Sequence, residues 1–170
     1  MNSKMTVKNN KGFSLLELLV VIAIISLLLS IAIAVFLGIR DKSRMTVFLH
    51  AAKEAKGDLL SWLDQAYHPV GKITSTSSID CQDVNAGELL RDGVATKYAY
   101  CRNFILREES PWKTGSPLWV VLTDATGIAA YAGQIVMVQK QPTASTWATS
   151  VSVYAIGLDG TTLYYDEAKY

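Results

Sequence analysis

Residues 11–25 read KGFSLLELLVVIAII, and this stretch decides the fold of the N-terminal part of the chain. From Leu18 to Ile39 no residue carries a charge, and leucine, isoleucine, valine and alanine dominate. A helix over these residues would be roughly 33 Å long, enough to cross a bilayer core of about 30 Å. A helix that is apolar on all sides does not fit the core of one small domain. The stretch therefore predicts a transmembrane helix.

The residues around the start of this helix have a distinct pattern. Residues 1–12 are polar, contain lysine at positions 4, 8 and 11 and no acid, and end at Gly12. The apolar run begins at Phe13 and contains one early charge, Glu17. A carboxylate near the start of a membrane helix is costly, so by default it marks a functional site.

The spacing suggests two interpretations of Glu17. If the chain is cut before Phe13, the new ammonium group lies four residues, or one helical turn, before Glu17. Glu17 would then neutralise that amine in its own chain or in a neighbour. Alternatively, the Glu17 side chain only reaches back to the lipid headgroups. Spacing alone does not separate the two.

The stretch at residues 11–25 resembles the type IV prepilin signature, with a glycine, an aromatic residue and a glutamate at fixed spacing before an apolar run. The resemblance implies that a prepilin peptidase cuts after Gly12 and that the new amino group of Phe13 is N-methylated. It also implies that Glu17 pairs with the Phe13 amine of an adjacent subunit during assembly. The resemblance is close over residues 11 to about 40, and elsewhere it covers only the general layout.

Two positions depart from the pattern of that family. Many type IV pilins carry a helix-breaking glycine and proline where this chain has Ser26 and Ala34. Without a proline, no backbone donor is lost and no ring clashes with the preceding turn. We therefore predict an unbroken helix in the free subunit.

Two other kinds of membrane segment compete with the prepilin interpretation. A secretory signal has an apolar core of about 7–15 residues and a small-residue cleavage site. Residues 32–34 (AIA) imitate such a site, but the apolar run is longer and continues past them. A plain signal anchor is the second competitor. Lysines precede the span, while Arg40, Lys42 and Arg44 follow it, so charge bias does not decide the orientation.

Beyond the span the helical period continues. Apolar residues recur at three- and four-residue steps, namely Met45, Phe48, Ala52, Ala55, Leu59, Trp62 or Leu63, and Ala66. His68 precedes Pro69, and a residue before proline is pushed out of the helical region. We predict one helix from about Ser14 to Tyr67, half in lipid or a filament core and half packed on a domain.

The last third of the chain changes to strand patterns. Four short runs rich in valine, isoleucine, leucine and tyrosine are separated by turn residues: Leu118–Thr123, Ile135–Lys140, Val151–Ile156 and Thr161–Tyr165. They predict an antiparallel meander of three or four strands over the exposed half of the helix. The fold class is α+β and pilin-like. We divide the chain into a cleaved leader (1–12), a transmembrane or filament-core helix (13–39) and an extracytoplasmic globular domain (40–170).

The two cysteines, Cys81 and Cys101, follow the apolar segment. If this part is exported, a disulfide between them closes a loop of about 20 residues and contributes around 3 kcal/mol in the chain-entropy model. In a reducing compartment they remain two thiols. Neither belongs to a CxxC pair, so a zinc site is not expected.

Residues 154–160 (YAIGLDG) resemble the late hairpin of the major pseudopilins of type II secretion, which bind calcium nearby. The resemblance implies a dense set of acidic ligands, whereas this chain offers only Asp159, Asp166 and Glu167. We therefore expect no metal or other cofactor, with calcium as the lesser alternative.

No residue pattern indicates catalysis. The sequence lacks a nucleophile elbow, a phosphate-cradling loop and a zinc-helix motif. His50 and His68 stand without obvious acidic or cysteine companions, so we expect ordinary surface or packing histidines. A basic face interleaved with aromatic residues is also missing, so nucleic acid is not an expected partner. We expect a structural protein rather than an enzyme.

The favoured hypothesis is a subunit of a helical type IV pilus-type filament, or fimbrium. The resemblance implies a prepilin peptidase, an inner-membrane assembly platform, membrane lipid before assembly and further copies of the chain as partners. The precursor would span the inner membrane once, and the filament would lie at the cell surface or in the periplasm. The alternatives are a pseudopilin of a type II secretion system and, from a different class, a membrane-anchored or secreted binding domain that never polymerises.

Overall fold

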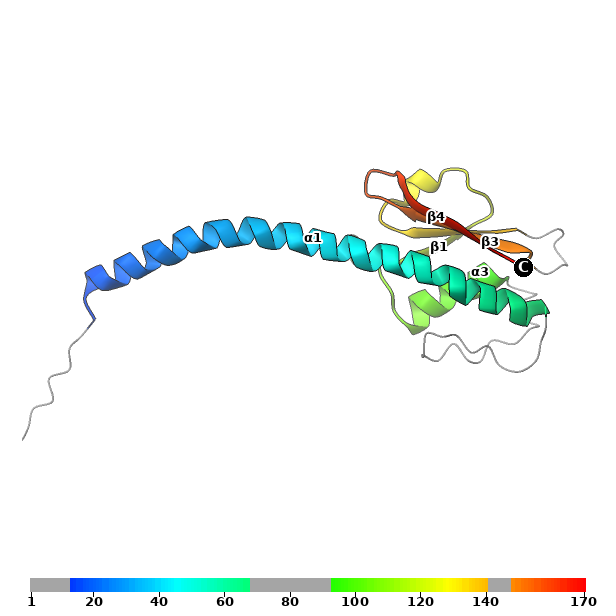
Figure 1. The fold of residues 1–170 in the computed structure, drawn as a ribbon, viewed down its shortest axis with the longest axis horizontal. Coiled ribbons are helices and arrows are strands. Elements are labelled where there is room, and N and C mark those ends of the chain that lie inside the picture. The colour runs from blue at the N-terminus through cyan, green and yellow to red at the C-terminus, as the bar shows by residue number, and fades with distance from the viewer. Residues whose placement is uncertain (1–12, 68–92, 141–147) are drawn as a thin grey trace, which may run out of the picture. The chain divides into compact units, whose positions relative to one another are not determined.

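The structure is a computed structural model, and it describes residues 13–67, 93–140 and 148–170. The chain divides into two compact units, Met1–Lys42 and Ser43–Tyr170. The described part of the first unit is the beginning of the long helix α1. The second unit contains the end of α1, the sheet and the hydrophobic core (Figure 1).

Helix α1 runs without interruption from Leu15 to Tyr67, which confirms the predicted helix to within one residue. It continues through Ser26 and Ala34, as predicted for the free subunit. The Ser26 hydroxyl donates to the carbonyl oxygen of Ile22 at 2.7 Å. Such back-bonding satisfies a serine hydroxyl within an apolar helical segment.

The part of α1 beyond Ser43 buries one face in the second unit. The buried positions are Phe48, Ala52, Ala55, Leu59, Trp62, Leu63 and Ala66 of the predicted stripe, together with Asp58, which the stripe did not include. Met45 packs against the same core from a partly buried position. Removing apolar surface from water contributes roughly 25 cal/mol per Å², so this stripe holds the end of α1 on the rest of the unit. Asp58 is the one charged residue among these buried positions.

The sheet has four strands in the order β1–β2–β3–β4. Their bounds are Trp119–Leu122 for β1, Ile135–Lys140 for β2, Ser150–Ile156 for β3 and Thr162–Lys169 for β4. Strands β2, β3 and β4 pair antiparallel, as predicted. The bounds of β2 match the prediction, whereas β4 continues to Lys169 and does not end at Tyr165.

The predicted all-antiparallel meander is wrong at its first pair. Strand β1 runs parallel to β2, with Trp119 opposite Ile135. A parallel pair needs a crossover of about a dozen residues, whereas a tight turn suffices for an antiparallel one. Residues 123–134 form this crossover and include the short 3-10 helix η2 (Ile128–Tyr131). Residues 124–127, which belong to the turn residues between the first two predicted strands, lie in this crossover and do not form a hairpin.

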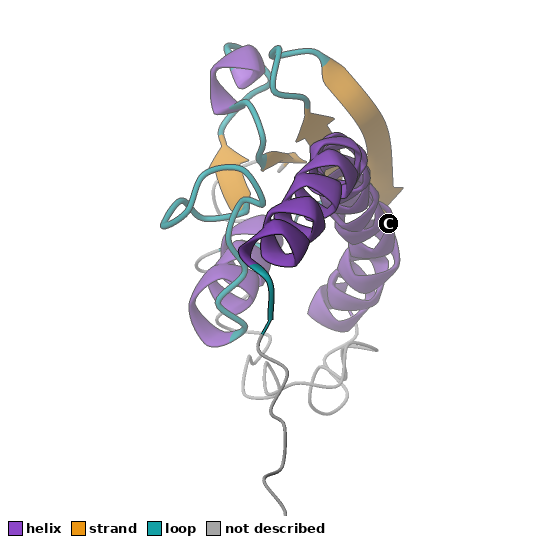
Figure 2. Ribbon diagram, turned by 90° about the vertical axis from the view of Figure 1, so that its left-hand side faces the viewer, coloured by secondary structure: helices purple, strands orange, loops and turns teal. Residues whose placement is uncertain are grey.

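Successive side chains of a strand point to opposite faces of the sheet. At the centre of the sheet both faces are buried, because other elements pack on each of them. One face shares the main core with the α1 stripe through Ile135, Met137, Val151, Val153 and Ala155. The other face carries a smaller cluster of Val136, Val138 and Ile156, against which Ile128 and Tyr131 of η2 pack. Figure 2 shows the strands between the short helix η2, at the top of the view, and the longer helices of the second unit.

A further helical segment precedes β1. Helix α3 (Val94–Tyr100) continues directly into the π-helix η1 (Cys101–Ile105). Gly93 begins this segment with a φ of 81°, a conformation that favours glycine. A Cβ atom at Gly93 would lie 2.5 Å from the side chain of Gln139. Gln139 also accepts the N–H of Ala95 at 2.8 Å, so strand β2 fixes the start of α3.

Candidate functional site

The first turn of α1 is closed by a capping box. The Ser14 hydroxyl accepts the N–H of Leu16 at 3.3 Å, and Glu17 Oε2 accepts the N–H of Ser14 at 3.1 Å. A serine at the N-cap and a glutamate three residues later form the sequence signature of this motif. Sequence reasoning considered Glu17 as a partner of the Phe13 amine or as a charge that reaches the headgroups. It missed the cap, although the S-x-x-E pattern at residues 14–17 signals it.

The capping box places the Glu17 carboxylate back over the start of the helix. The amide nitrogen that it binds links Ser14 to Phe13, whose side chain is exposed. Gly12, the predicted cleavage residue, lies outside the described residues. The nitrogen of Phe13, which a cut after Gly12 would release as an amine, is one residue away from the bonded amide. Glu17 therefore lies at the end of the helix where that charge would appear.

The first half of α1 exposes apolar side chains in every direction. All residues from Phe13 to Ile39 are exposed in the structure. By length and composition this part of α1 suffices to cross a membrane. Apolar surface of this extent is unfavourable in water, so it requires lipid or other apolar helices around it.

Residues 7–33 match the family model described as the prokaryotic N-terminal methylation motif. The match includes Gly12, Phe13 and Glu17 and continues into the apolar half of α1. This chain carries the prepilin-type motif of type IV pilin-like proteins. The motif, with the long apolar helix, is that of a membrane-anchored, pilin-like or pseudopilin precursor. No match was found among curated proteins or among solved structures.

The predicted disulfide of this pilin-like chain involves two parts of the second unit. Cys101 is buried at the start of η1, directly after α3. Cys81 lies outside the described residues. The pairing of Cys81 with Cys101 therefore stays a prediction.

The three acidic residues considered for calcium bind different partners. Asp159 accepts the N–H and hydroxyl of Thr161, Asp166 accepts from the Lys56 ammonium at 2.8 Å, and Glu167 accepts from a serine hydroxyl of β3. The Lys56 hydrogen bond, joined by the N–H of Glu167, holds the pKa of Asp166 below its ordinary value. Within the described ranges no three potential metal-ligating residues come together.

The histidine prediction needs one correction. His50 does have an acidic companion, because its Nδ1 lies 3.1 Å from Glu54 Oε1 one turn further along α1. Both side chains are exposed, so this pair contributes little to stability. They line an open hollow of about 340 Å³ whose other wall includes Arg102 and Glu108. His68 lies outside the described residues.

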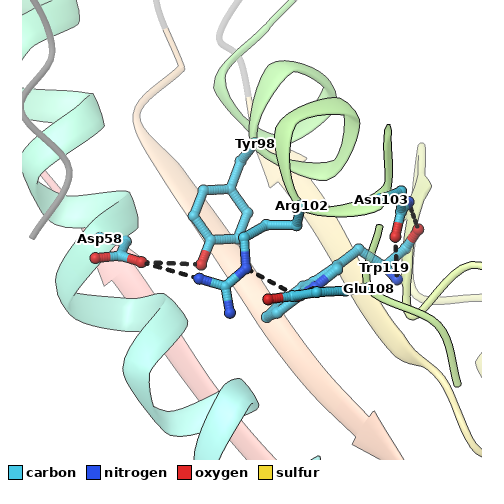
Figure 3. Close-up of polar contacts among 6 residues, drawn as sticks. All are labelled: Asp58, Tyr98, Arg102, Asn103, Glu108 and Trp119. Carbon is cyan, nitrogen blue, oxygen red and sulfur yellow. Dashed lines mark hydrogen bonds and ion pairs between the residues drawn. The ribbon is translucent and has the colours of Figure 1, made fainter. Parts of the chain in front are cut away.

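Sequence reasoning missed a polar cluster beneath this hollow (Figure 3). The guanidinium of Arg102 donates through Nε to Glu108 Oε2 at 2.9 Å and lies 3.5 Å from Asp58 Oδ2. The Tyr98 hydroxyl donates to the same Asp58 oxygen at 3.1 Å, and the indole N–H of Trp119 donates to Glu108. The guanidinium also lies over the Tyr98 and Trp119 rings, 5.6 and 5.1 Å from their centroids.

This cluster joins α1, the α3–η1 segment and β1. Burial raises the pKa of the Tyr98 hydroxyl; the Arg102 charge opposes the rise and the Asp58 carboxylate adds to it. Tyr98 therefore stays protonated and donates throughout the physiological range. A buried ion pair adds little net stability over an apolar replacement, but removing one partner leaves an uncompensated charge. The cluster thus connects these three elements through contacts that cannot be removed singly without leaving a buried charge unpaired.

Proposed function

We propose that this chain is a structural, non-catalytic subunit of a helical type IV pilus-type filament, made as a membrane-anchored prepilin. The observation that carries the proposal is the methylation motif at residues 7–33, set at the start of an exposed apolar helix that continues into a packed globular unit. The motif accounts for processing, and the apolar helix accounts for both the anchor and the filament core.

In this proposal the precursor first spans the inner membrane, with the globular unit outside the cytoplasm. Prepilin peptidase removes residues 1–12, and the amine of Phe13 is methylated. The apolar half of α1 then leaves the bilayer, through an assembly platform, for a core of like helices. This transfer keeps its apolar surface away from water throughout.

The Glu17 carboxylate would neutralise the Phe13 amine of a neighbouring subunit. Two observations support this role. A membrane-embedded carboxylate needs a compensating partner. In addition, the Glu17 bond to the Ser14 amide orients it toward the start of the helix.

A pseudopilin of type II secretion is the alternative within the same class, because the motif does not separate the two. We favour the pilus because the three acidic residues considered for calcium bind separate partners: Asp159 in the β3–β4 turn bonds Thr161, whereas Asp166 and Glu167, further along β4, bond Lys56 and Ser150. Calcium titration of the full chain tests this preference. Tight binding at the β3–β4 end would favour the pseudopilin.

Intact mass and N-terminal sequencing of the protein from its native cells test the proposal. A chain that starts at N-methylated Phe13 is expected, and it should be recovered in filaments sheared from the cells. A chain that starts at Met1 or Val35 would contradict it and favour an anchored or secreted domain that never polymerises.

The Glu17→Ala variant tests the pairing step. It should still be cut after Gly12 but should yield far fewer filaments, because the Phe13 amine loses its partner. Glu54→Ala, which removes an exposed glutamate from the other half of the helix, is the matched control. Normal filaments from the Glu17→Ala chain would contradict the pairing.

A further inference from the structure

The inference rests on the proposed filament and concerns how the globular units contact one another. A helical filament grows through heterologous contacts, in which a surface on one copy binds a different surface on the next. The globular unit therefore needs two distinct, complementary surfaces. Exposed apolar side chains show where they are, because contiguous apolar patches on a soluble unit mark interaction sites.

The first surface is an aromatic patch formed by Tyr100, Phe104 and Ile105 at the junction of α3 and η1. The side chains of Tyr100 and Phe104 are 54% and 69% exposed, and Ile105 is also exposed. The two rings stack on each other with their centroids 5.1 Å apart. Stacked aromatic side chains are typical anchors of protein–protein interfaces.

The residues between these exposed side chains hold the aromatic patch in place. Cys101 and Arg102 are buried, and Arg102 belongs to the polar cluster of Figure 3. Asn103 binds the backbone of β1 twice, donating to the carbonyl of Trp119 at 2.7 Å and accepting its N–H at 3.0 Å. Since the patch is fixed before it meets a partner, little side-chain or backbone entropy is lost on binding.

The second surface is a turn patch formed by Leu158, Leu163 and Tyr165 around the β3–β4 turn. Leu158 is 56% exposed, and the other two side chains are exposed as well. Tyr165 packs across the strand pair on Tyr154, with ring centroids 4.9 Å apart. In Figure 1 this turn and the α3–η1 segment lie on opposite sides of the second unit. Two patches on opposite sides of one unit allow each copy to bind a copy on either side, so that the contacts repeat along a filament and do not close a ring.

The remaining large apolar side chains that are exposed in the described part of this unit do not form a third patch. They are Val47 and Leu60, far apart on α1, and Tyr170, which stacks on Tyr67.

One exposed residue beside each patch carries a charge opposite in sign to the other. Arg107 is exposed two residues after the aromatic patch, and the exposed Glu109 further along already accepts the N–H of Gly115. Asp159 is exposed next to Leu158 in the turn patch. The hydrogen bonds from the Thr161 hydroxyl and N–H lower the pKa of Asp159, so the turn patch keeps its negative charge at neutral pH. Opposite charges at the rims of two apolar surfaces favour their mutual binding and its register.

We propose that the aromatic patch of one subunit binds the turn patch of the next subunit in the filament, with Arg107 facing Asp159. The contact supplements the burial of the apolar helices and sets how neighbouring globular units are oriented.

Site-specific photo-cross-linking in assembled filaments tests the contact directly. The full chain carrying Phe104→p-benzoylphenylalanine is expressed in its native cells, and sheared filaments are irradiated and digested. We expect a covalent dimer whose linked peptides contain position 104 of one copy and residues 157–165 of another. The same photoreactive residue at Val47, which is exposed outside both patches, should not give that product. A dimer linked elsewhere, or a link only within one chain, would overturn the proposal.

A charge exchange provides an independent test in the same filaments. Arg107→Asp and Asp159→Arg should each lower the yield of sheared filaments several-fold, and the double variant should recover much of it. Because Asp159 also binds Thr161, Asp159→Asn, which keeps an acceptor for the turn, separates lost charge from a damaged turn. It should lower the yield less than Asp159→Arg. No recovery in the double variant would contradict the pairing of these charges.

The two proposals fail in different ways. If the wild-type chain starts at Met1 or is missing from sheared filaments, both the proposed filament function and the proposed patch contact are wrong. If filaments of methylated chains form but the links lie elsewhere, only the patch contact is wrong.

Discussion

The two halves of α1 are one continuous helix, yet they obey different rules. From Leu15 to Ile39 apolar side chains point in all directions and every residue is exposed. From Phe48 to Ala66 the apolar residues form one stripe, and that stripe is buried. The backbone is the same in both, so the difference lies in the period of the side chains. A helix that is apolar all round needs an apolar environment, whereas a striped helix needs only one packing partner.

The polar residues of the two halves differ in the same way. In the first half, Ser26 and Glu17 bind the backbone of their own helix. In the second half, Asp58 binds the side chains of Tyr98 and Arg102, which lie 40 and 44 positions further along the sequence. The first half therefore satisfies its polar groups locally and can move between environments as a unit. The second half is specified by its tertiary partners.

A matched pair of phenylalanines should give the largest contrast. Phe48 is buried and packs edge-on against Trp112 with ring centroids 5.1 Å apart, whereas Phe36 is exposed. We expect Phe48→Ala to cost about 3–5 kcal/mol in the free energy of unfolding of the globular unit. Phe36→Ala should change it by less than about 0.5 kcal/mol. Denaturant titration of the full chain in mild detergent, followed by tryptophan fluorescence, measures both. Equal losses would mean that the two halves do not differ as described.

The buried carboxylate of the second half should give a smaller effect. Asp58→Asn removes the charge that faces Arg102 but keeps an acceptor for Tyr98. We expect a loss of about 1.5–3 kcal/mol, the range for hydrogen bonds to charged groups. Asp64→Asn, an exposed substitution six residues further along α1, is the control and should be nearly neutral. The same denaturant titration measures both variants. Equal free energies of unfolding for Asp58→Asn and Asp64→Asn would show that the polar cluster does not contribute to stability.

The capping box of the first half should have a local effect only. Ser14→Ala should cost about 0.5–2 kcal/mol at the start of α1, while Ser14→Thr should retain most of the cap. Hydrogen exchange of the amides of Leu15 to Leu18 in micelles should accelerate in the Ser14→Ala chain alone. The unfolding free energy of the globular unit should stay unchanged. A loss there would show that the two halves are energetically coupled.

The smallest effect should come from the ion pair that links α1 to β4. Lys56 Nζ lies 2.8 Å from Asp166 Oδ1, and both side chains are partly exposed. We expect Asp166→Asn to cost no more than about 1 kcal/mol at pH 7. The folded-state pKa of Asp166 lies below its ordinary value of 3.8, so its stabilising effect is present above that pH. The effect should disappear as the pH falls further through the folded pKa.

Unfolding titrations of both proteins from pH 7 down to about pH 2 measure this pH dependence. The difference between them should shrink toward zero at the acid end. A difference that stays constant over this range would show that the charge of Asp166 is not involved.

The sequence by itself determined the features that depend on local spacing. The helix from Leu15 to Tyr67 followed from its apolar period, its end from Pro69, and the strand Ile135–Lys140 from its β-branched run. The prepilin-type motif also needs only residues close together in the chain. The capping box of Ser14 and Glu17 belongs to this group, because its signature spans four residues and was there to be found.

Only the tertiary structure decided the features that depend on distant partners. Strand β1 runs parallel to β2 because residues 123–134 fold into a crossover, which their turn-like composition did not reveal. Arg102 is buried because Asp58 and Glu108 meet it from two different elements. The strand pairing and the ion pair of Asp58 with Arg102 both join residues that are far apart in the sequence, so the spacing of nearby residues does not predict them. Periodicity and spacing therefore predict which elements form, and the long-range contacts decide how they pair.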